Sequence, residues 1–429
     1  MNMTRLSLIA AATLGLLTTS CASRKAAQVT PTDDVATRQN PSADFDRAFG
    51  VDPQDAPITR FAAANNDFAF HLFNDVRGFD SKVVSPLSVS YLMAMLANGA
   101  DGTTRTQIMK AIACSGLTVE QLNGACHALM TPDPDADPDS LETVSIANYI
   151  ALNKGYELRP AFASTIRTDY DGEVDAFDFR SADALGRING WCSRHTGGMI
   201  PKFLDRIEPS LMSYVLNAVY FNGTWANKFM PAQTKLEAFR GYTRDRKMVQ
   251  MMHQEEKFDI YEGKDYSAIS LPYGAYNHTM TILLPAEGKS IDQMMAKLTP
   301  AVLAKLPSQM ERCIVDLKLP RFSTETEQPL NEAIARLGAP LMFQSDAANF
   351  SLLADGNFYV SQMKQKAKIE VTEEGTRAAA ITGAWVATTA LAPEPRHTAF
   401  HADRPFAYVI TERRTGAILF MGQFTGSGM

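Results

Sequence analysis

The chain has 429 residues, of which 45% are hydrophobic and 21% charged, as is typical of a globular protein with a large core. Its formal net charge is −6 and it has no long basic cluster, so nucleic acid is not expected as a partner. No linker rich in proline, serine and glycine interrupts the chain after about residue 61, which favours one large domain.

The N-terminal residues are expected to direct export. Arg5 precedes an apolar run over residues 6–17, which is too short to span a bilayer but suits the core of a signal peptide. Residues 17–21 then resemble the cleavage box of a bacterial lipoprotein, with Cys21 as the lipidated first residue. The alternative is cleavage after Ala22, which would give a freely secreted protein. Either way the folded part is expected outside the cytoplasm, and a lipid anchor would favour the outer membrane.

The chain therefore divides into three predicted parts: a signal peptide at 1–20, a disordered tether at 21–57 and a folded domain at 58–429. The tether is rich in small and polar residues and has little periodic apolar pattern.

The folded part shows a mixed alternation of helices and strands. Helical spacing predicts helices at residues 61–76, 89–98 (starting from 85–88), 103–113, 118–130, 160–170, 182–196, 291–297 and 330–337. Apolar runs predict strands at 143–152, 214–221, 267–271, 279–284, 313–319, 367–371, 406–411 and 417–424, the last two as a hairpin. Several of these strands are apolar throughout, as the central strands of a covered sheet should be.

No metal or redox site is predicted. The alternating aspartates of residues 131–139 suggest calcium, but three prolines and the lack of a central glycine favour a solvated insertion. Cys114, Cys126, Cys192 and Cys313 form no C-x-x-C pair. Cys114 and Cys126 are close enough in sequence to form a disulfide after export, and buried free thiols are the alternative.

A run of small residues at 373–392 has the alternation of a strand, although it lies between two other strand-like segments. Every second position over residues 376–386 is small and uncharged, whereas the alternate positions include Arg377, Ile381 and Trp385. Because successive strand residues point to opposite faces, this segment could enter a sheet with its small set inward. The pattern indicates a conformational switch, and a flexible surface loop is the alternative.

Motifs of common enzymes are missing from the sequence, which contains no G-x-S-x-G, H-E-x-x-H or G-x-G-x-x-G. Residues 283–290 end like a phosphate-binding loop, but Leu283 replaces its first glycine. Neither a catalytic function nor a cofactor is expected.

Ordered blocks between residues 61 and 424 resemble the serpins, a family of serine protease inhibitors. The matching blocks lie at residues 85–89, 188–191, 195–200, 216–225, 249–252, 317–322, 349–351, 370–376, 403–406 and 419–422. Each block alone is a weak signal, but their order and spacing make the set specific. The resemblance implies an α+β fold with three β-sheets, about nine helices and an exposed reactive-centre loop.

The resemblance also implies a mechanism in which a serine protease cuts the loop and is held as an acyl-enzyme. The freed segment then enters the central sheet as a new strand and carries the covalently bound protease to the opposite pole. About 14 inserted residues at ~3.3 Å each span roughly 46 Å, close to the ~50 Å diameter of such a domain. About a dozen new ladder hydrogen bonds supply on the order of 10 kcal/mol.

The family pattern assigns the loop hinge to Glu373, Glu374, Gly375, Thr376, Arg377, Ala378, Ala379 and Ala380. Arg377 stands where the family usually has glutamate. It belongs to the set of residues that would face outward after insertion, so the change is expected to interfere little with insertion. The family distance from the hinge glycine places the cut at Thr389–Ala390. The downstream half is slightly longer than in many relatives, which leaves Leu391–Ala392 as the runner-up.

The residues around both candidate bonds are small or aliphatic, and no lysine or arginine lies between Arg377 and Arg396. This disfavours a trypsin-like target and favours an elastase-like or subtilisin-like protease with a shallow apolar pocket. Alternatively, the loop is small only to permit insertion, and specificity is left undefined.

Residues that control sheet opening are implied by the same resemblance: Ser85, Ser88, Asn217, Gln365, Trp225 and Arg321. Gln365 replaces a family histidine, so pH-dependent behaviour from that position is not expected. Glu373 and Arg321 match a family ion pair, with Trp225 nearby.

Three function hypotheses are compared. An inhibitory serpin, monomeric and anchored to a membrane only through its lipid, is favoured by the hinge composition. A non-inhibitory serpin acting as a binding or chaperone-like module would usually carry charge or proline at the inward hinge positions. A hydrolase would need a nucleophile motif, and the chain has none.

Overall fold

The computed structural model describes residues 56–131, 143–274, 276–376 and 395–427, all within one unit of the chain, Asn40–Met429. The expected signal peptide, Cys21, nearly all of the tether and residues 132–139 lie outside this description. So do the loop residues Arg377–Ala392, including both candidate scissile bonds.

Nine α-helices lie in the described part of the chain, and most begin at a proline or a capping residue. For example, Thr118 and Gln121 form a capping box at the start of α5. The helices are α2 (Pro57–Val76), α3 (Pro86–Gly99), α4 (Gly102–Ala111), α5 (Val119–Met130), α6 (Pro160–Tyr170), α7 (Ala184–His195), α8 (Ile291–Met295), α9 (Pro300–Gln309) and α10 (Asn331–Arg336). No helix among the described residues is long and apolar enough to cross a membrane.

One sheet has nine strands. Its order is β1 (Lys82–Val84), β15 (Ile418–Phe424), β14 (Phe406–Glu412), β8 (His278–Pro285), β7 (Tyr266–Pro272), β6 (Arg246–Glu262), β9 (Glu311–Pro320) and β13 (His397–His401), with β5 (Lys235–Arg240) also on β6. The long strand β6 pairs with β7 near its end and with β5 and β9 before that. Two of the three expected sheets therefore share β6 and form one hydrogen-bonded array.

The second sheet has six strands and includes a two-residue strand between two long ones. Its order is β10 (Phe322–Pro329), β11 (Gln362–Val371), β12 (Gly375–Thr376), β4 (Ser213–Thr224), β2 (Thr143–Asn153) and β3 (Glu173–Phe177). Strands β4 and β11 also pair directly with each other, in parallel.

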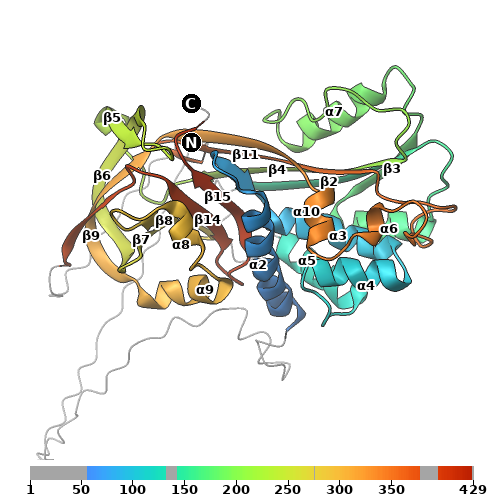
Figure 1. The fold of residues 1–429 in the computed structure, drawn as a ribbon, viewed down its shortest axis with the longest axis horizontal. Helices are drawn as coiled ribbons and strands as arrows, with labels where there is room; N and C mark the ends of the chain where they lie inside the picture. Colours follow the sequence, from blue (N-terminus) through green and yellow to red (C-terminus); the bar gives the residue numbers. More distant parts are fainter. Residues whose placement is uncertain (1–55, 132–142, 275, 377–394, 428–429) are drawn as a thin grey trace, which may run out of the picture. The chain divides into compact units, whose positions relative to one another are not determined.

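Helices cover both faces of this six-stranded sheet (Figure 1). On one face lies α7, whose Trp191 stacks on Tyr149 of β2 with ring centroids 5.0 Å apart. On the other face lies α3, all of whose residues except Asn98 are buried. A helix that is apolar on every side has to be enclosed, and α3 occupies the centre of the domain beneath β2 and β4.

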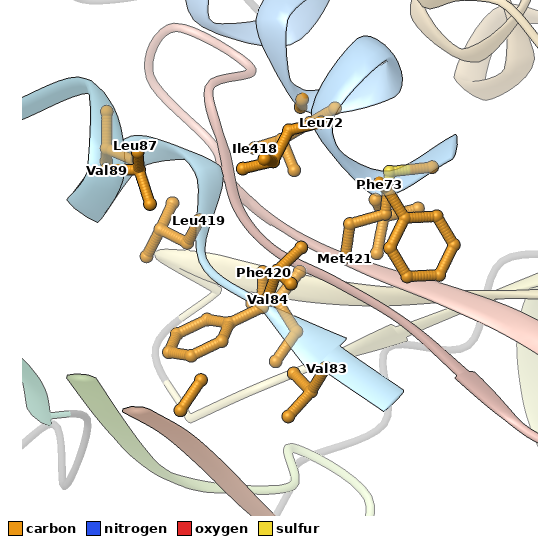
Figure 2. Close-up of a cluster of buried hydrophobic side chains, with 14 of the residues drawn as sticks. Leu72, Phe73, Val83, Val84, Leu87, Val89, Ile418, Leu419, Phe420 and Met421 are labelled. Carbon is orange, nitrogen blue, oxygen red and sulfur yellow. The ribbon is translucent and has the colours of Figure 1, made fainter. Parts of the chain in front are cut away.

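A hydrophobic cluster fixes the N-terminus of α3 (Figure 2). Strand β1 pairs with β15 and leads directly into the helix through Ser85. The cluster joins α2, β1, α3 and β15, and its labelled members are Leu72, Phe73, Val83, Val84, Leu87, Val89, Ile418, Leu419, Phe420 and Met421. This packing holds Ser85 and Ser88 in place beneath the six-stranded sheet.

All four described cysteines are buried free thiols: Cys114, Cys126, Cys192 and Cys313. Burial raises the pKa of Cys114 to about 12, so this thiol stays protonated and unreactive at neutral pH.

Candidate functional site at the seam of the six-stranded sheet

The line along which β4 and β11 meet, called the seam here, is closed below and open above. Direct pairing runs from Tyr214 with Gln362 to Tyr220 with Lys368. Above that level the two strands diverge and β12 lies between them. Thr376 pairs with Val371 on β11 and with Gly223 on β4, antiparallel to both. The first residues of the loop are thus already a short strand inside the sheet.

Gly375 makes this insertion possible. Its φ of +143° belongs to the region that favours glycine. A Cβ added here would lie 2.1 Å from the carbonyl oxygen of Gly223 and 2.6 Å from Cα of Thr224, both backbone atoms of β4. The turn before it is closed by the backbone N–H of Thr372, which donates to the carbonyl of Gly375 at 2.8 Å. No other residue type fits this position without displacing β12.

Thr376 is fully buried, and its hydroxyl lies 2.8 Å from that of Tyr273. The Tyr273 ring stacks on Trp225 with centroids 4.4 Å apart, and Nε1 of Trp225 donates to the carbonyl of Thr372 at 2.9 Å. The aromatic pair therefore supports both ends of the turn that carries the hinge.

Glu373 is the charged anchor of the same turn. Its side chain is 5% exposed and accepts hydrogen bonds from Arg321 and, at 2.6 Å, from the hydroxyl of Thr234. Burial raises the pKa of Glu373, but the hydrogen bonds from Arg321 and Thr234 outweigh it and the pKa lies below its ordinary value. Glu374 forms a more exposed ion pair with Lys228 at 2.9 Å.

A row of buried amides crosses the closed part of the seam. Asn217 of β4 lies in register with Gln365 of β11 on one side and with Asn148 of β2 on the other. Nε2 of Gln365 donates to Oδ1 of Asn217 at 2.8 Å, and Nδ2 of Asn217 donates to Oδ1 of Asn148 at 2.7 Å.

The row is tied to the start of α3 underneath. Gln365 bonds with the backbone of Ser85 in both directions, at 3.0 and 2.9 Å, and Nδ2 of Asn217 donates to Oγ of Ser88. Opening the seam would break the bond between Gln365 and Asn217.

Two atoms at this level have no hydrogen-bond partner among the described residues. They are Oγ of Ser85 and Nδ2 of Asn148, whose residues are 0% and 2% exposed. Each buried orphan polar atom costs about 1–3 kcal/mol. An added hydrogen-bonding group at this level could therefore provide partners for these two atoms.

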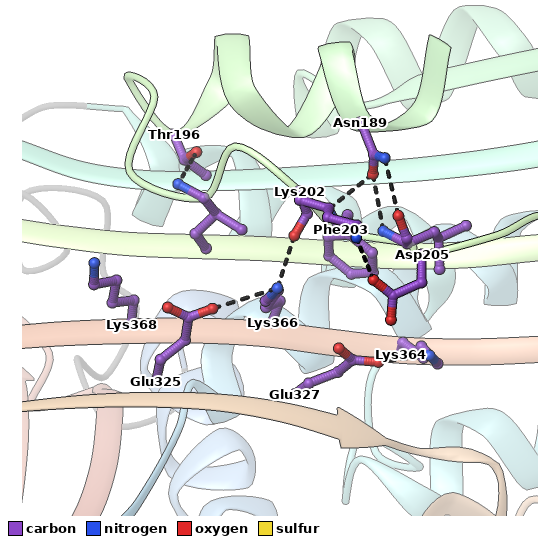
Figure 3. A network of polar contacts seen from close by, with 12 residues as sticks. Asn189, Thr196, Lys202, Phe203, Asp205, Glu325, Glu327, Lys364, Lys366 and Lys368 are labelled. Atoms are coloured by element: carbon purple, nitrogen blue, oxygen red, sulfur yellow. Dashed lines mark hydrogen bonds and ion pairs between the residues drawn. The ribbon is translucent and has the colours of Figure 1, made fainter. Parts of the chain in front are cut away.

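The outer face of the seam is crossed by the segment that follows α7 (Figure 3). Asn189 of α7 holds this segment through the backbone N–H groups of Phe203 and Leu204, both at 2.8 Å. Nζ of Lys366 on β11 donates to the carbonyl of Lys202 at 2.7 Å and pairs with Glu325 of β10 at 3.3 Å. The segment has to move before any strand can enter beneath it.

The structure brings the described control residues into two groups. Ser85, Ser88, Asn217 and Gln365 meet at the amide row, whereas Trp225, Arg321 and Glu373–Thr376 meet at the upper end. Sequence reasoning missed Thr234, Lys228, Tyr273 and Asn148, each an isolated polar or aromatic residue whose partner lies far along the chain. No local pattern could have found them.

These features define a class of protein whose central sheet carries the start of its own next strand. Residues 63–426 match a family model described as Serpin (serine protease inhibitor). The chain is 33% identical over 387 residues to leukocyte elastase inhibitor of Bos taurus, an alignment that covers 86% of this chain and 100% of the relative.

Solved structures agree with the sequence match. The crystal structure of the thermophilic serpin tengpin in its native state superposes with a TM-score of 0.77 at 28% identity, covering 85% of this chain and 94% of that one. Human thyroxine-binding globulin, complexed with its hormone, gives a TM-score of 0.77 at 25% identity, covering 86% and 98%.

The chain belongs to the serpin family. Its fold is the α+β serpin fold, as the sequence predicted. The family is named for protease inhibition and not for catalysis, and its inhibitory members form complexes with target proteases. The family includes inhibitory members such as leukocyte elastase inhibitor, although some serpins are not inhibitors.

Proposed function

We propose that this chain is an inhibitory serpin that traps a serine protease as an acyl-enzyme by inserting its cleaved loop into the seam between β4 and β11. The observation that carries the proposal is β12, because the hinge is already seated in register at the open upper end of the seam. Insertion then requires extension of an existing strand and not the nucleation of a new one.

Continuing the register of β12 downward supports this proposal. Each further loop residue would fall opposite the preceding residue of both β4 and β11. Thr382 would then lie between Asn217 and Gln365, at the level where Ser85 and Asn148 have orphan polar atoms. A hydroxyl can both donate and accept, so Thr382 suits the gap that the parted amide row would leave.

The same register explains why alternate loop residues are small. Positions in phase with Thr376 would face α3, a helix with almost no free surface. Ala378, Ala380 and Ala384 add little volume there, whereas a bulky side chain would strain a packed core. Positions in phase with Arg377 would lie under the segment that follows α7, and this segment has to shift to admit Trp385.

The position of the cut also fits the length of the seam. In the continued register Val386 would lie opposite Ser213, the first residue of β4. Cleavage at Thr389–Ala390 leaves a short link between the end of the seam and the acyl bond, which would hold the protease against the lower pole. Leu391–Ala392 would leave a longer link and remains the second candidate.

The proposed target is an elastase-like or subtilisin-like protease, because the residues at both candidate bonds are small or aliphatic. The decisive assay mixes the protein with pancreatic elastase or subtilisin and looks for an SDS-stable adduct, with trypsin as the control. Mass spectrometry of the released C-terminal fragment identifies the bond. An adduct with elastase or subtilisin supports the proposal, and quantitative cleavage without any adduct would refute it.

A second measurement tests the stored energy directly. Cleavage within the loop is expected to raise the denaturation midpoint strongly, because insertion adds about a dozen ladder hydrogen bonds. An unchanged midpoint would show that the loop does not insert. In that case the alternative is a non-inhibitory serpin acting as a binding or chaperone-like module. The structure of thyroxine-binding globulin with its hormone shows that the fold can bind a small ligand.

We also propose that the protein is exported as a monomer and held at the bacterial envelope by a lipid on Cys21, or else secreted. The proposal rests on the N-terminal sequence. Membrane fractionation of the parent and of Cys21→Ser tests it, because only the parent should sediment with membranes.

A further inference from the structure

Immediately beyond Thr376, two residues face each other across the open end of the seam. Thr376 pairs with Gly223 and Val371, so a strand that continues from it places its next residue between Asn222 of β4 and Glu370 of β11. Burial alternates along β11, with Glu370 half-buried and Val371 fully buried. Asn222 and Glu370 therefore lie on the outer face of the sheet, opposite to the face that buries Thr376.

Both residues offer acceptors at this point. Oδ1 of Asn222 is buried and has no hydrogen-bond partner within the described part of the chain. One carboxylate oxygen of Glu370 forms an ion pair with Nζ of Lys368 at 2.9 Å, and the other has no ion-pair partner among the described residues. Two acceptors from different strands, one of them charged, form a receptor for a cation with several N–H donors.

The residue that follows Thr376 is Arg377. We propose that Asn222 and Glu370 form a receiving site for the guanidinium of Arg377, occupied at the first step of loop insertion. The inference rests on the proposed inhibitory function and assigns a register-setting role to this residue. A planar guanidinium can donate to the amide oxygen and the carboxylate at once, which an ammonium group does less well.

The site favours the correct register of insertion over a register shifted by one residue. A slip of one residue would turn Arg377 to the inner face, where Thr376 is now enclosed between Gly223 and Val371. A cation cannot be buried there without a partner, so the slipped register is rejected before the rest of the loop enters. Lys368 is the competing cation on β11, and the pair formed by Lys228 and Glu374 is the neighbouring charge above.

A double-mutant cycle tests the site. The parent, Arg377→Gln, Glu370→Gln and the double variant are compared in two measurements. The first is the number of inhibitor molecules consumed for each protease molecule trapped. The second is the denaturation midpoint before and after cleavage of the loop. Each single change should raise the consumption about threefold to tenfold, and the double change should cost no more than either one. Before cleavage the denaturation midpoints of the four proteins should agree within experimental error.

The matched control is Glu325→Gln, which removes a carboxylate from the outer face of the neighbouring strand β10. Its effect should add to that of Arg377→Gln without coupling. If the cleaved parent is no more stable than the intact parent, loop insertion is refuted, and the proposed site for Arg377 is refuted together with it. If the cleaved parent is stabilised but Arg377 and Glu370 act additively, the site alone is overturned.

Discussion

The upper end and the middle of the seam differ in the contacts that hold their strands. At the upper end the hinge turn is fully engaged: Glu373 meets Arg321 and Thr234, the Thr372 carbonyl meets Trp225, and Thr376 meets Tyr273. In the middle, Gln365 and Asn217 hold the strands together while Ser85 and Asn148 keep orphan atoms.

This contrast separates two tasks within one sheet. The upper end fixes the starting register through the contacts of the hinge turn, although Asn222 and Thr224 keep orphan side-chain oxygens beside it. The middle is closed by the bond between Gln365 and Asn217, and under the proposed function an inserted Thr382 would offer its orphan atoms a partner.

The largest effect should come from breaking the upper end. Glu373→Lys would bury a cation beside Arg321, leave the Thr234 hydroxyl without its acceptor and expel the hinge turn. We expect the intact form to lose about 3 kcal/mol, since an uncompensated buried charge is among the costliest of point changes. The upper edges of β4 and β11 would then be free to accept a strand from a second molecule.

Native gels after mild warming check this outcome, because the variant should form a ladder of polymers while the parent stays monomeric. Glu374→Lys is the matched control: it reverses the adjacent charge, but at a more exposed side chain whose partner is Lys228. A purely monomeric Glu373→Lys protein would contradict the role given to the upper end.

A smaller effect is expected in the middle of the seam. Asn217→Ala would remove the acceptor of Gln365 and the donor to Asn148 and Ser88 together, which should destabilise the intact form by about 2 kcal/mol. Asn148→Ala is the control in the same row. It removes one described bond and one orphan atom, so it should cost less than about 1 kcal/mol.

Guanidinium denaturation of the intact proteins measures both changes. Equal losses for Asn217→Ala and Asn148→Ala would mean that the row acts through packing and not through its hydrogen bonds.

The sequence was informative where residues are buried on both sides and much less so elsewhere. The apolar runs of β4, β14 and β15 predicted strands because central strands exclude polar residues. No strand was predicted at β10, whose exposed face carries Ser323, Glu325 and Glu327 in place of apolar residues. Strand β12 covers only the start of the run whose alternation predicted a strand able to enter a sheet. That these two residues are already inserted depends on a gap that only the folded sheet creates.

For the site, family resemblance supplied single residues but not their arrangement. Gln365 was expected near Ser85, Ser88 and Asn217, but nothing local indicated that Asn148 completes a row across three strands. The same holds for Thr234 and Tyr273, which reach the hinge from separate loops. Such contacts depend on strand register, which is set by the whole sheet.

The smallest effect, and the sharpest distinction between the upper end and the middle of the seam, should come from pH. The pKa of Glu373 is lowered in the folded protein: burial opposes this shift, but the hydrogen bonds from Arg321 and Thr234 dominate. A carboxyl group with a lowered pKa contributes stability above its ordinary value of 4.5, and that contribution is lost as pH falls through the folded value. Acid should therefore weaken the upper end, whereas the amide row contains no titratable group and should not respond.

The test follows the stability of the intact form from pH 7 into this acidic range, in the parent and in Glu373→Gln. The variant should start less stable at neutral pH, and its difference from the parent should shrink as Glu373 becomes protonated. Asn217→Ala should differ from the parent by the same amount at every pH. If the Glu373→Gln difference stayed constant with pH, the ionised carboxylate would not be the anchor. The contrast between the upper end and the middle would then have to be explained by backbone contacts alone.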